Sequence, residues 1–199
     1  NHVKDGGFYG HPTSRPAPKD EYSGRETLDP PAVWFPYKWV RSASGVIEIA
    51  DERFGPFKGQ LLVGDFQNAV ITRVQMEKVD GQWQGAVWPF LKGFQSGVNR
   101  MVMAADGNLY VGGGKVKAWA ANAPAFHSLE RISFKGKVPF EINSVKALTD
   151  GFELTFTQPV DKESARAIDG FDVWQYKYKF HKSYGSPEFD HEGKKDSFT

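Results

Sequence analysis

Short runs of apolar residues, alternating with polar ones or bounded by Gly, Pro and Asp, follow one another along the chain. The runs cover residues 46–50, 59–66, 69–78, 82–90, 98–105, 108–113 and 128–135. Their short length and their content of Val, Ile, Phe and Trp are typical of β-strands. Asp80-Gly81 separates two runs and predicts a hairpin, and Asp106-Gly107 predicts a further turn. The pattern therefore predicts an all-β chain.

Strand patterns continue beyond a boundary near residues 136–139, with runs at 141–148 and 152–158 joined by Asp150-Gly151. After a short turn around residues 161–167, a third run at 171–180 has one strongly aromatic face. We interpret residues 139–199 as the start of a β-sandwich domain (Ig-like), which needs about seven strands. The sandwich is therefore expected to be incomplete, and the C-terminus truncated or disordered.

Two stretches of the chain repeat each other at a distance of about 48 residues, within the range of repeat periods that β-propeller blades show. Residues 59–64 read G-x-L-x-V-G, and residues 107–112 read the same. Each copy is followed by a run with an arginine before a branched apolar residue, Arg73 in the first and Arg131 in the second. A period of this length with several short strands per unit is typical of β-propeller blades. Since one blade cannot bury both of its faces, we expect the chain to belong to a larger ring.

Two segments interrupt the strand pattern. Residues 1–45 carry many Gly and Pro, which excludes regular helix over most of this stretch and predicts long loops anchored by aromatic residues. Residues 114–127 are read as a long loop between strands. Loops of this kind either form a functional rim or pack as a connection.

Composition excludes several classes of function. The net charge of +1 gives no electrostatic footprint for nucleic acid. No cysteine is present, which excludes disulfides, thiolate metal sites and a cysteine nucleophile. No apolar run reaches the roughly 18 residues that span a bilayer. The chain begins Asn1-His2-Val3, without methionine or signal peptide, so we expect it to be processed or cut from a longer protein.

No catalytic or metal-binding motif stands out, so no catalytic or metal-ligating residue is predicted. Gly112-Gly113-Gly114 is not followed by a helix start, and we interpret it as a bend at a strand end rather than a phosphate-binding loop. None of the five histidines has a partner at helical i, i+4 spacing, and packing or exposure is the simpler interpretation.

The candidate binding residues lie at strand ends and in aromatic loops. Polar strand ends line the axial channel of a propeller, where ligands bind, and aromatic loops converge on the same face. Arg100 could hydrogen-bond a sugar hydroxyl or carboxylate, and Trp34 could stack on a sugar ring. The alternatives are that Asp65 only forms a turn, or pairs with Arg100 to close the channel. The full set is Tyr9, His11, Trp34, Asp65, Gln67, Asn99 and Arg100.

The order of several motifs resembles the glucose/sorbosone dehydrogenase-like propellers. Residues 7–12 resemble the G-x-N-Y-G-W-P loop of that family, and residues 33–36 and 42–45 resemble its tryptophan–proline stretch and its A-P-S-G. Residues 57–65 resemble F-x-G-x-L-x-V-G, and residues 105–111 resemble P-D-G-x-L-Y-V. The resemblance implies that residues 1–138 are the C-terminal blades of a six-bladed propeller.

A divergent branch of the family, found in large secreted bacterial proteins, is similar over a longer range. Residues 129–131, 136–142 and 151–161 match the segments that follow the propeller there. That branch often carries a c-type cytochrome elsewhere in the polypeptide. The resemblance implies a periplasmic or extracellular protein whose partners include the remaining blades, from missing sequence or another chain.

Departures from the family pattern bear on its cofactor. Pyrroloquinoline quinone carries three carboxylates and needs cations. The family's lysine after the V-G strand end falls on Gln67, its arginine pair falls on residues 97–100, and His11 replaces the loop tryptophan. The family's catalytic histidine and calcium ligands lie upstream of Asn1. The resemblance thus favours a carbohydrate- or protein-binding scaffold without cofactor, with quinone or haem c only in the parent protein. The alternative is an aldose oxidoreductase module that passes electrons to a quinone or c-type haem.

Overall fold

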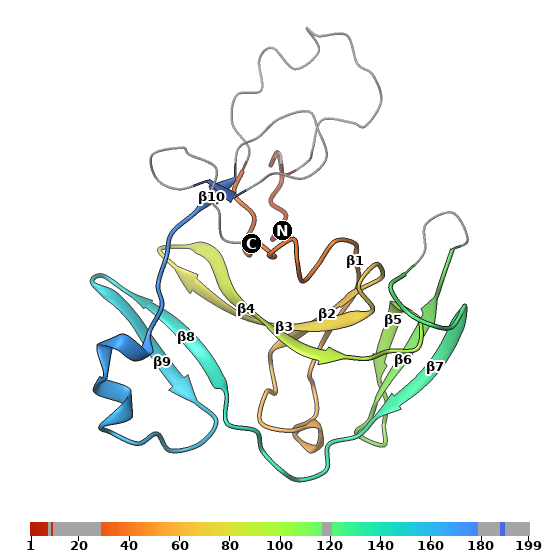
Figure 1. Ribbon diagram of the computed structural model, residues 1–199. Helices are drawn as coiled ribbons and strands as arrows, with labels where there is room; N and C mark the ends of the chain where they lie inside the picture. Colours follow the sequence, from red (N-terminus) through yellow and green to blue (C-terminus); the bar gives the residue numbers. More distant parts are fainter. Residues whose placement is uncertain (8, 10–28, 117–120, 179–187, 190–199) are drawn as a thin grey trace, which may run out of the picture. The chain divides into compact units, whose positions relative to one another are not determined.

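The computed structural model describes residues 1–7, 9, 29–116, 121–178 and 188–189 (Figure 1). The chain divides into two compact units, one of Ala32–Pro159 and the other of Asn1–Pro31 with Val160–Thr199. The described residues form antiparallel strands and three short 3₁₀ helices, so the predicted all-β class is confirmed. None of the helices in these ranges has the length and hydropathy that crossing a bilayer requires.

The first sheet of the larger unit contains four antiparallel strands in chain order. They are β1 (Ala43–Glu48), β2 (Leu61–Asp65), β3 (Val70–Val79) and β4 (Gln82–Lys92). The connection from β1 to β2 contains the 3₁₀ helix η1 (Glu52–Phe54). Asp80 and Gly81 join β3 to β4 with φ of 47° and 80°, the left-handed backbone that a two-residue hairpin needs, as their sequence predicted.

The second sheet contains three antiparallel strands, also in chain order. They are β5 (Gly97–Met103), β6 (Leu109–Gly114) and β7 (His127–Ile132). The turn before β6 uses Gly107 at φ 81°, as predicted from Asp106-Gly107. Gly112-Gly113-Gly114 lies inside β6 rather than in a bend beyond it.

The sequence repeat corresponds to a structural repeat. In the first sheet Leu62 pairs with Arg73, and in the second Tyr110 pairs with Arg131, at the same register. The first strand of each sheet also has a shift in its pairing register near its start. The shift lies between Ala43 and Val46 in β1 and between Val98 and Arg100 in β5. The strands β5, β6 and β7 are therefore a second copy of β1, β2 and β3, and β4 has no counterpart among the described strands of the second sheet.

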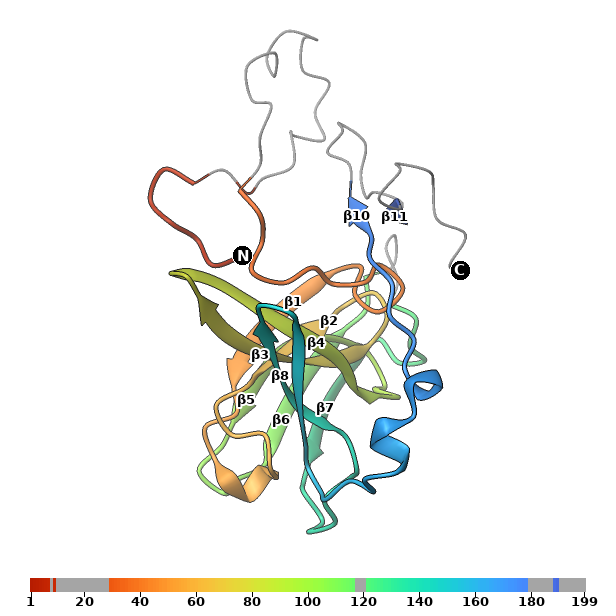
Figure 2. The same ribbon diagram turned by 90° about the vertical axis from the view of Figure 1, so that its left-hand side faces the viewer.

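A separate hairpin follows, formed by β8 (Ile142–Leu148) and β9 (Gly151–Phe156). It is part of the larger unit, where β8 lies against β3 and β4 (Figures 1 and 2). Its apolar face is only partly covered, since Phe140 and Phe156 stack at 5.4 Å while Phe152 is 68% exposed. The domain boundary at 138/139 and the sandwich that it would open remain predictions.

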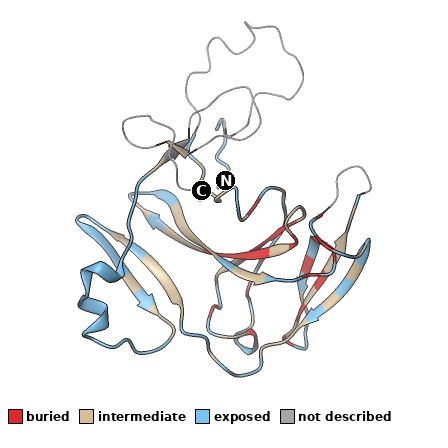
Figure 3. Ribbon diagram, viewed as in Figure 1, coloured by how far each residue is buried: buried red, intermediate tan, exposed pale blue. Residues whose placement is uncertain are grey.

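The core lies between the two repeated sheets. Its fully buried members include Leu62 and Ile71 of the first sheet and Val98 and Leu109 of the second. Buried residues gather on β2 and β3 and on β5 and β6 (Figure 3). The apolar alternation of these strands therefore reflects the stacking of one sheet on the other.

The described parts of the smaller unit contain little regular structure. Two 3₁₀ helices, η2 (Ser164–Arg166) and η3 (Ile168–Gly170), occupy and follow the predicted turn, where Asp161 accepts a hydrogen bond from the backbone N–H of Ser164. Two short strands pair further on, β10 (Lys177–Tyr178) and β11 (Glu188–Phe189). The prediction of a strand over 171–180 is wrong for residues 171–176, which are irregular. Alternation alone does not make a strand: Val173 is 84% exposed, and no described strand pairs with this segment.

Candidate functional site

Asp65 holds the loop around the end of β2. Its side chain is fully buried, and Oδ2 accepts hydrogen bonds from the backbone N–H groups of Arg41 and Ser42. Oδ1 accepts from the backbone N–H of Asn68 at 2.6 Å. The bond to Asn68 is the turn-forming role that the sequence offered as an alternative. The bonds to Arg41 and Ser42 also tie this turn to the segment before β1. The carboxylate is inaccessible to a ligand in this arrangement.

Gln67 lies beside Asp65 in a group of three carboxamides, which we call the carboxamide cluster: Gln67, Asn68 and Asn122. Gln67 Nε2 donates to Asn122 Oδ1 at 3.5 Å, and Asn122 Nδ2 donates to Asn68 Oδ1 at 3.3 Å. Asn68 Nδ2 donates to the carbonyl of Trp39 at 3.0 Å, and the N–H of Asn122 donates to the carbonyl of Gln67 at 2.7 Å. The cluster thus ties three loops together while Asn122 stays exposed.

Asn99 and Arg100 lie on β5, and both are exposed. Arg100 Nη1 donates to the carbonyl and the side-chain oxygen of Asn99, at 2.9 and 3.0 Å. The Asp65 carboxylate accepts its hydrogen bonds from backbone N–H groups, and no ion pair joins it to Arg100 among the described residues. The alternative in which Arg100 pairs with Asp65 to close the channel is therefore not observed. Beside these residues, Ser44 Oγ of β1 donates to the carbonyl of Val98 at 2.7 Å. The first strands of the two sheets therefore lie side by side, with Arg100 free of the core.

The aromatic candidates Trp34 and Tyr9 belong to different units of the chain. Trp34 is 50% exposed and follows Val33, whose side chain lies against Gly85 of β4. Tyr9 belongs to the smaller unit, where its hydroxyl accepts from the backbone N–H of Lys4 at 3.2 Å. His11 lies outside the described residues. The structure thus joins Gln67 to the surroundings of Asp65, and places Asn99 and Arg100 together on β5.

Arg73 of β3 was noted in the sequence only as part of the repeat, yet it is the largest fully buried side chain among the described residues. Its exposed fraction is 0%. The guanidinium carbon lies 3.9 Å from the ring centroid of Phe57 and 4.4 Å from that of Trp88, both within cation–π range. Burial lowers the pKa of Arg73 to about 10, although Glu141 opposes the shift. The side chain therefore remains protonated at neutral pH.

The same guanidinium binds the segment that leads into β8. Nη2 donates to the carbonyl of Ile142 at 2.8 Å, and Nη1 donates to the carbonyl of Asn143 at 3.2 Å and to Oε1 of Gln60. Glu141 Oε2 lies 3.5 Å from Nη2. Arg73 thus connects β3 to a segment that follows it by about seventy residues, and such a long-range partner leaves no local sequence signal.

Two further side chains on the same face of β3 continue this contact along β8. Gln75 Oε1 accepts from the N–H of Val145, and Glu77 Oε1 accepts from the N–H of Ala147, each at 3.1 Å. Because residues two apart on a strand share a face, Arg73, Gln75 and Glu77 form one row. The β8–β9 hairpin is thus attached to the first sheet through side chains and not through a strand ladder.

Gly64 of β2 lies against Val98 of the second sheet. A Cβ atom there would lie well inside van der Waals distance of Val98 Cγ1 and 3.0 Å from Ser44 Oγ. We therefore expect Gly64→Ala to lower the free energy of unfolding by about 1–3 kcal/mol, measured by urea denaturation, because the sheets must separate to admit the methyl group.

The matched control is Gly112→Ala, at the repeat-related position of β6. A Cβ atom there would meet only the carbonyl of Arg100, at 3.9 Å. We expect this variant to stay within about 0.5 kcal/mol of the unsubstituted chain. Equal losses for the two alanines would contradict the sheet stacking described here.

The candidate residues do not fit pyrroloquinoline quinone. The amide of Gln67 is bonded within the carboxamide cluster. Among the candidates Asp65, Gln67, Asn99 and Arg100, the guanidinium of Arg100 is the one cation. One cation does not balance the three carboxylates of the quinone. Among the described residues, no group of three or more His, Asp or Glu could hold a metal ion.

Comparison with known proteins adds no assignment. No family model, no curated protein and no solved structure matches this chain.

Proposed function

We propose that this chain is part of a glucose/sorbosone dehydrogenase-like propeller protein, secreted to the periplasm or beyond, and that it acts as a scaffold that binds carbohydrate or protein. What supports the blade assignment is the structural repeat: two antiparallel sheets with the same register, stacked face to face. The remaining blades, from further sequence or another chain, are its proposed partners.

The proposed ligand region is the exposed polar surface beside β1 and β5, the first strands of the two sheets, with Arg100 and Asn99 on β5. Both side chains are exposed, and together they present amide and guanidinium donors that suit sugar hydroxyls. Trp34 is the aromatic candidate for stacking on a sugar ring. The lysine and the arginine pair that the resemblance would place against the quinone fall on Gln67 and residues 97–100, which supports a binding role over quinone-dependent oxidation.

The test is calorimetric titration of the chain with aldoses such as glucose and xylose, alongside the Arg100→Ala and Trp34→Ala variants. We expect each substitution to weaken binding by at least about tenfold, since each removes a direct contact with the sugar. Lys146→Ala, which changes an exposed side chain on β8, serves as the control and is expected to bind like the unsubstituted chain.

Unchanged sugar binding in both variants would place the site elsewhere. Stoichiometric binding of pyrroloquinoline quinone in the presence of calcium, with reduction of a dye by an aldose, would instead support the oxidoreductase alternative.

A further inference from the structure

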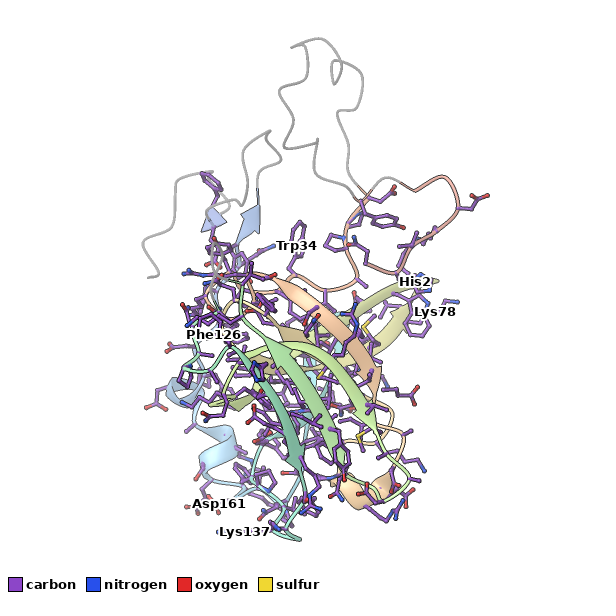
Figure 4. The ribbon with its side chains drawn as sticks, turned by 90° about the vertical axis from the view of Figure 1, so that its right-hand side faces the viewer. His2, Trp34, Lys78, Phe126, Lys137 and Asp161 are labelled. Carbon is purple, nitrogen blue, oxygen red and sulfur yellow. The ribbon has the colours of Figure 1, made fainter. Side chains whose placement is uncertain are left out.

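The second sheet has one face that the described residues of the larger unit leave uncovered. Its residues follow from the register, since Val102 pairs with Tyr110 and Tyr110 with Arg131, while Arg100 pairs with Gly112 and Gly112 with Leu129. We call this surface the open face: Arg100, Val102, Tyr110, Gly112, Leu129 and Arg131. Leu129 is 78% exposed and Val102 56%. Figure 4 views the sheet from this side, with Phe126 just before β7.

The first sheet carries a related surface at the corresponding positions. By the repeat, Leu62 corresponds to Tyr110, Gly64 to Gly112, Ile71 to Leu129 and Arg73 to Arg131. Leu62, Ile71 and Arg73 are each 0% exposed, and Gly64 is buried.

The second sheet covers part of this related surface. Val98 of β5 approaches Gly64 so closely that a Cβ atom on the glycine would clash with it. Equivalent positions are therefore buried by a neighbouring sheet in the first copy and exposed in the second.

We propose that the open face docks a third antiparallel sheet of the same construction. The proposal rests on the blade assignment and not on carbohydrate binding. A docked sheet that covers Arg100 would leave Asn99 and Trp34 as the proposed sugar contacts. Gly112 leaves space at the centre of the open face, as Gly64 does for Val98, so the partner presents a small aliphatic side chain there. Stacked sheets lie about 10 Å apart, a distance that aliphatic side chains fill.

The charge of the open face indicates which sheet it accepts. Its six residues include two arginines and no carboxylate, and Asp106 beside them accepts a hydrogen bond from the hydroxyl of Tyr110. Two copies of this chain packed face to face through it would bring four guanidinium groups together, which disfavours a symmetric dimer. Arg73 in the first copy is met by Glu141 of the segment before β8, and Arg131 interacts electrostatically with Asp106.

A duplicated sheet provides the probe. Residues 94–135 are inserted a second time after Lys135, so that the chain carries its own third sheet. Because the chain has no cysteine, Leu129→Cys in the first copy reports the exposure of the open face through its rate of thiol labelling. We expect the added sheet to slow labelling at least about tenfold relative to the same substitution in the unextended chain. A labelling rate equal to that of the unextended chain would overturn the proposal.

The matched control replaces Val98 and Met101 by Asp in the inserted copy only. These residues form the buried side that contacts the first sheet, so the altered insert is expected to leave the cysteine at position 129 of the first copy fully reactive. Lys78→Cys, at an exposed position of β3, is expected to react equally in all the proteins. Since the readout is thiol reactivity, a failure of sugar binding does not affect it.

Sedimentation of the unextended chain provides a second measurement should the longer chain not fold. We expect a monomer in which Leu129→Cys reacts at the rate of an exposed thiol. A concentration-dependent dimer that Leu129→Arg abolishes would assign the open face to a second copy of this chain and overturn the proposal.

Discussion

Replacing Arg73 with alanine is expected to lower the free energy of unfolding by about 3–5 kcal/mol, the loss expected when a large buried side chain is removed and its partners are left unpaired. The substitution leaves a cavity between Phe57 and Trp88 and removes the donor from the carbonyls of Ile142 and Asn143. Urea denaturation followed by tryptophan fluorescence measures the loss, with Trp88 as a reporter beside the altered site.

Arg131→Ala provides the matched control, because Arg131 occupies the repeat-related position but is exposed. Its effect is expected to stay within about 0.5 kcal/mol. Arg73→Lys keeps the charge but loses the planar fork and the ring contacts, so it is expected to be destabilising as well. If Arg73→Ala lowered the free energy of unfolding no more than Arg131→Ala does, the buried guanidinium would make no net contribution to stability.

Asp65→Ala is expected to lower the free energy of unfolding by about 3 kcal/mol, because hydrogen bonds to a charged acceptor contribute about 1.5–3 kcal/mol each and water can replace some of them. The variant leaves the N–H groups of Arg41, Ser42 and Asn68 without their shared acceptor. Thermal and urea unfolding measure the loss.

Asp65→Asn separates the contribution of the negative charge from that of the acceptor oxygens. The amide keeps one acceptor oxygen but turns an NH₂ group towards backbone donors, so an intermediate loss is expected. Asp150→Ala, at an exposed position before β9, is expected to have little effect. If Asp65→Ala matched that control, the loop would be held by other contacts.

The strands were predictable from sequence where local signals agreed with tertiary packing. Asp80-Gly81 required a backbone with positive φ, and the apolar alternation around it fixed the faces of β3 and β4. Residues 171–176 had the same alternation and form no strand. A strand needs a partner along its edge, and the sequence of one segment does not state where that partner comes from.

The candidate site was predictable only in part, for a similar reason. The position of Asp65 after a glycine at a strand end indicated a turn, and the structure confirms that role. Arg73 gave no such signal, since its burial depends on Glu141 and on the backbone of the next two residues, far along the chain. Asn122 was missed because its partners Gln67 and Asn68 belong to another loop.

The attachment of β8 to β3 through side chains bears on aggregation. An edge strand with available N–H groups is a template on which another chain can add a strand and begin a fibril. On β8, the N–H groups of Val145 and Ala147 are already bonded to Gln75 and Glu77. A foreign strand would have to displace both side chains before it could pair there. Two polar residues on one face of β3, Gln75 and Glu77, therefore protect the chain against self-templated growth along β8.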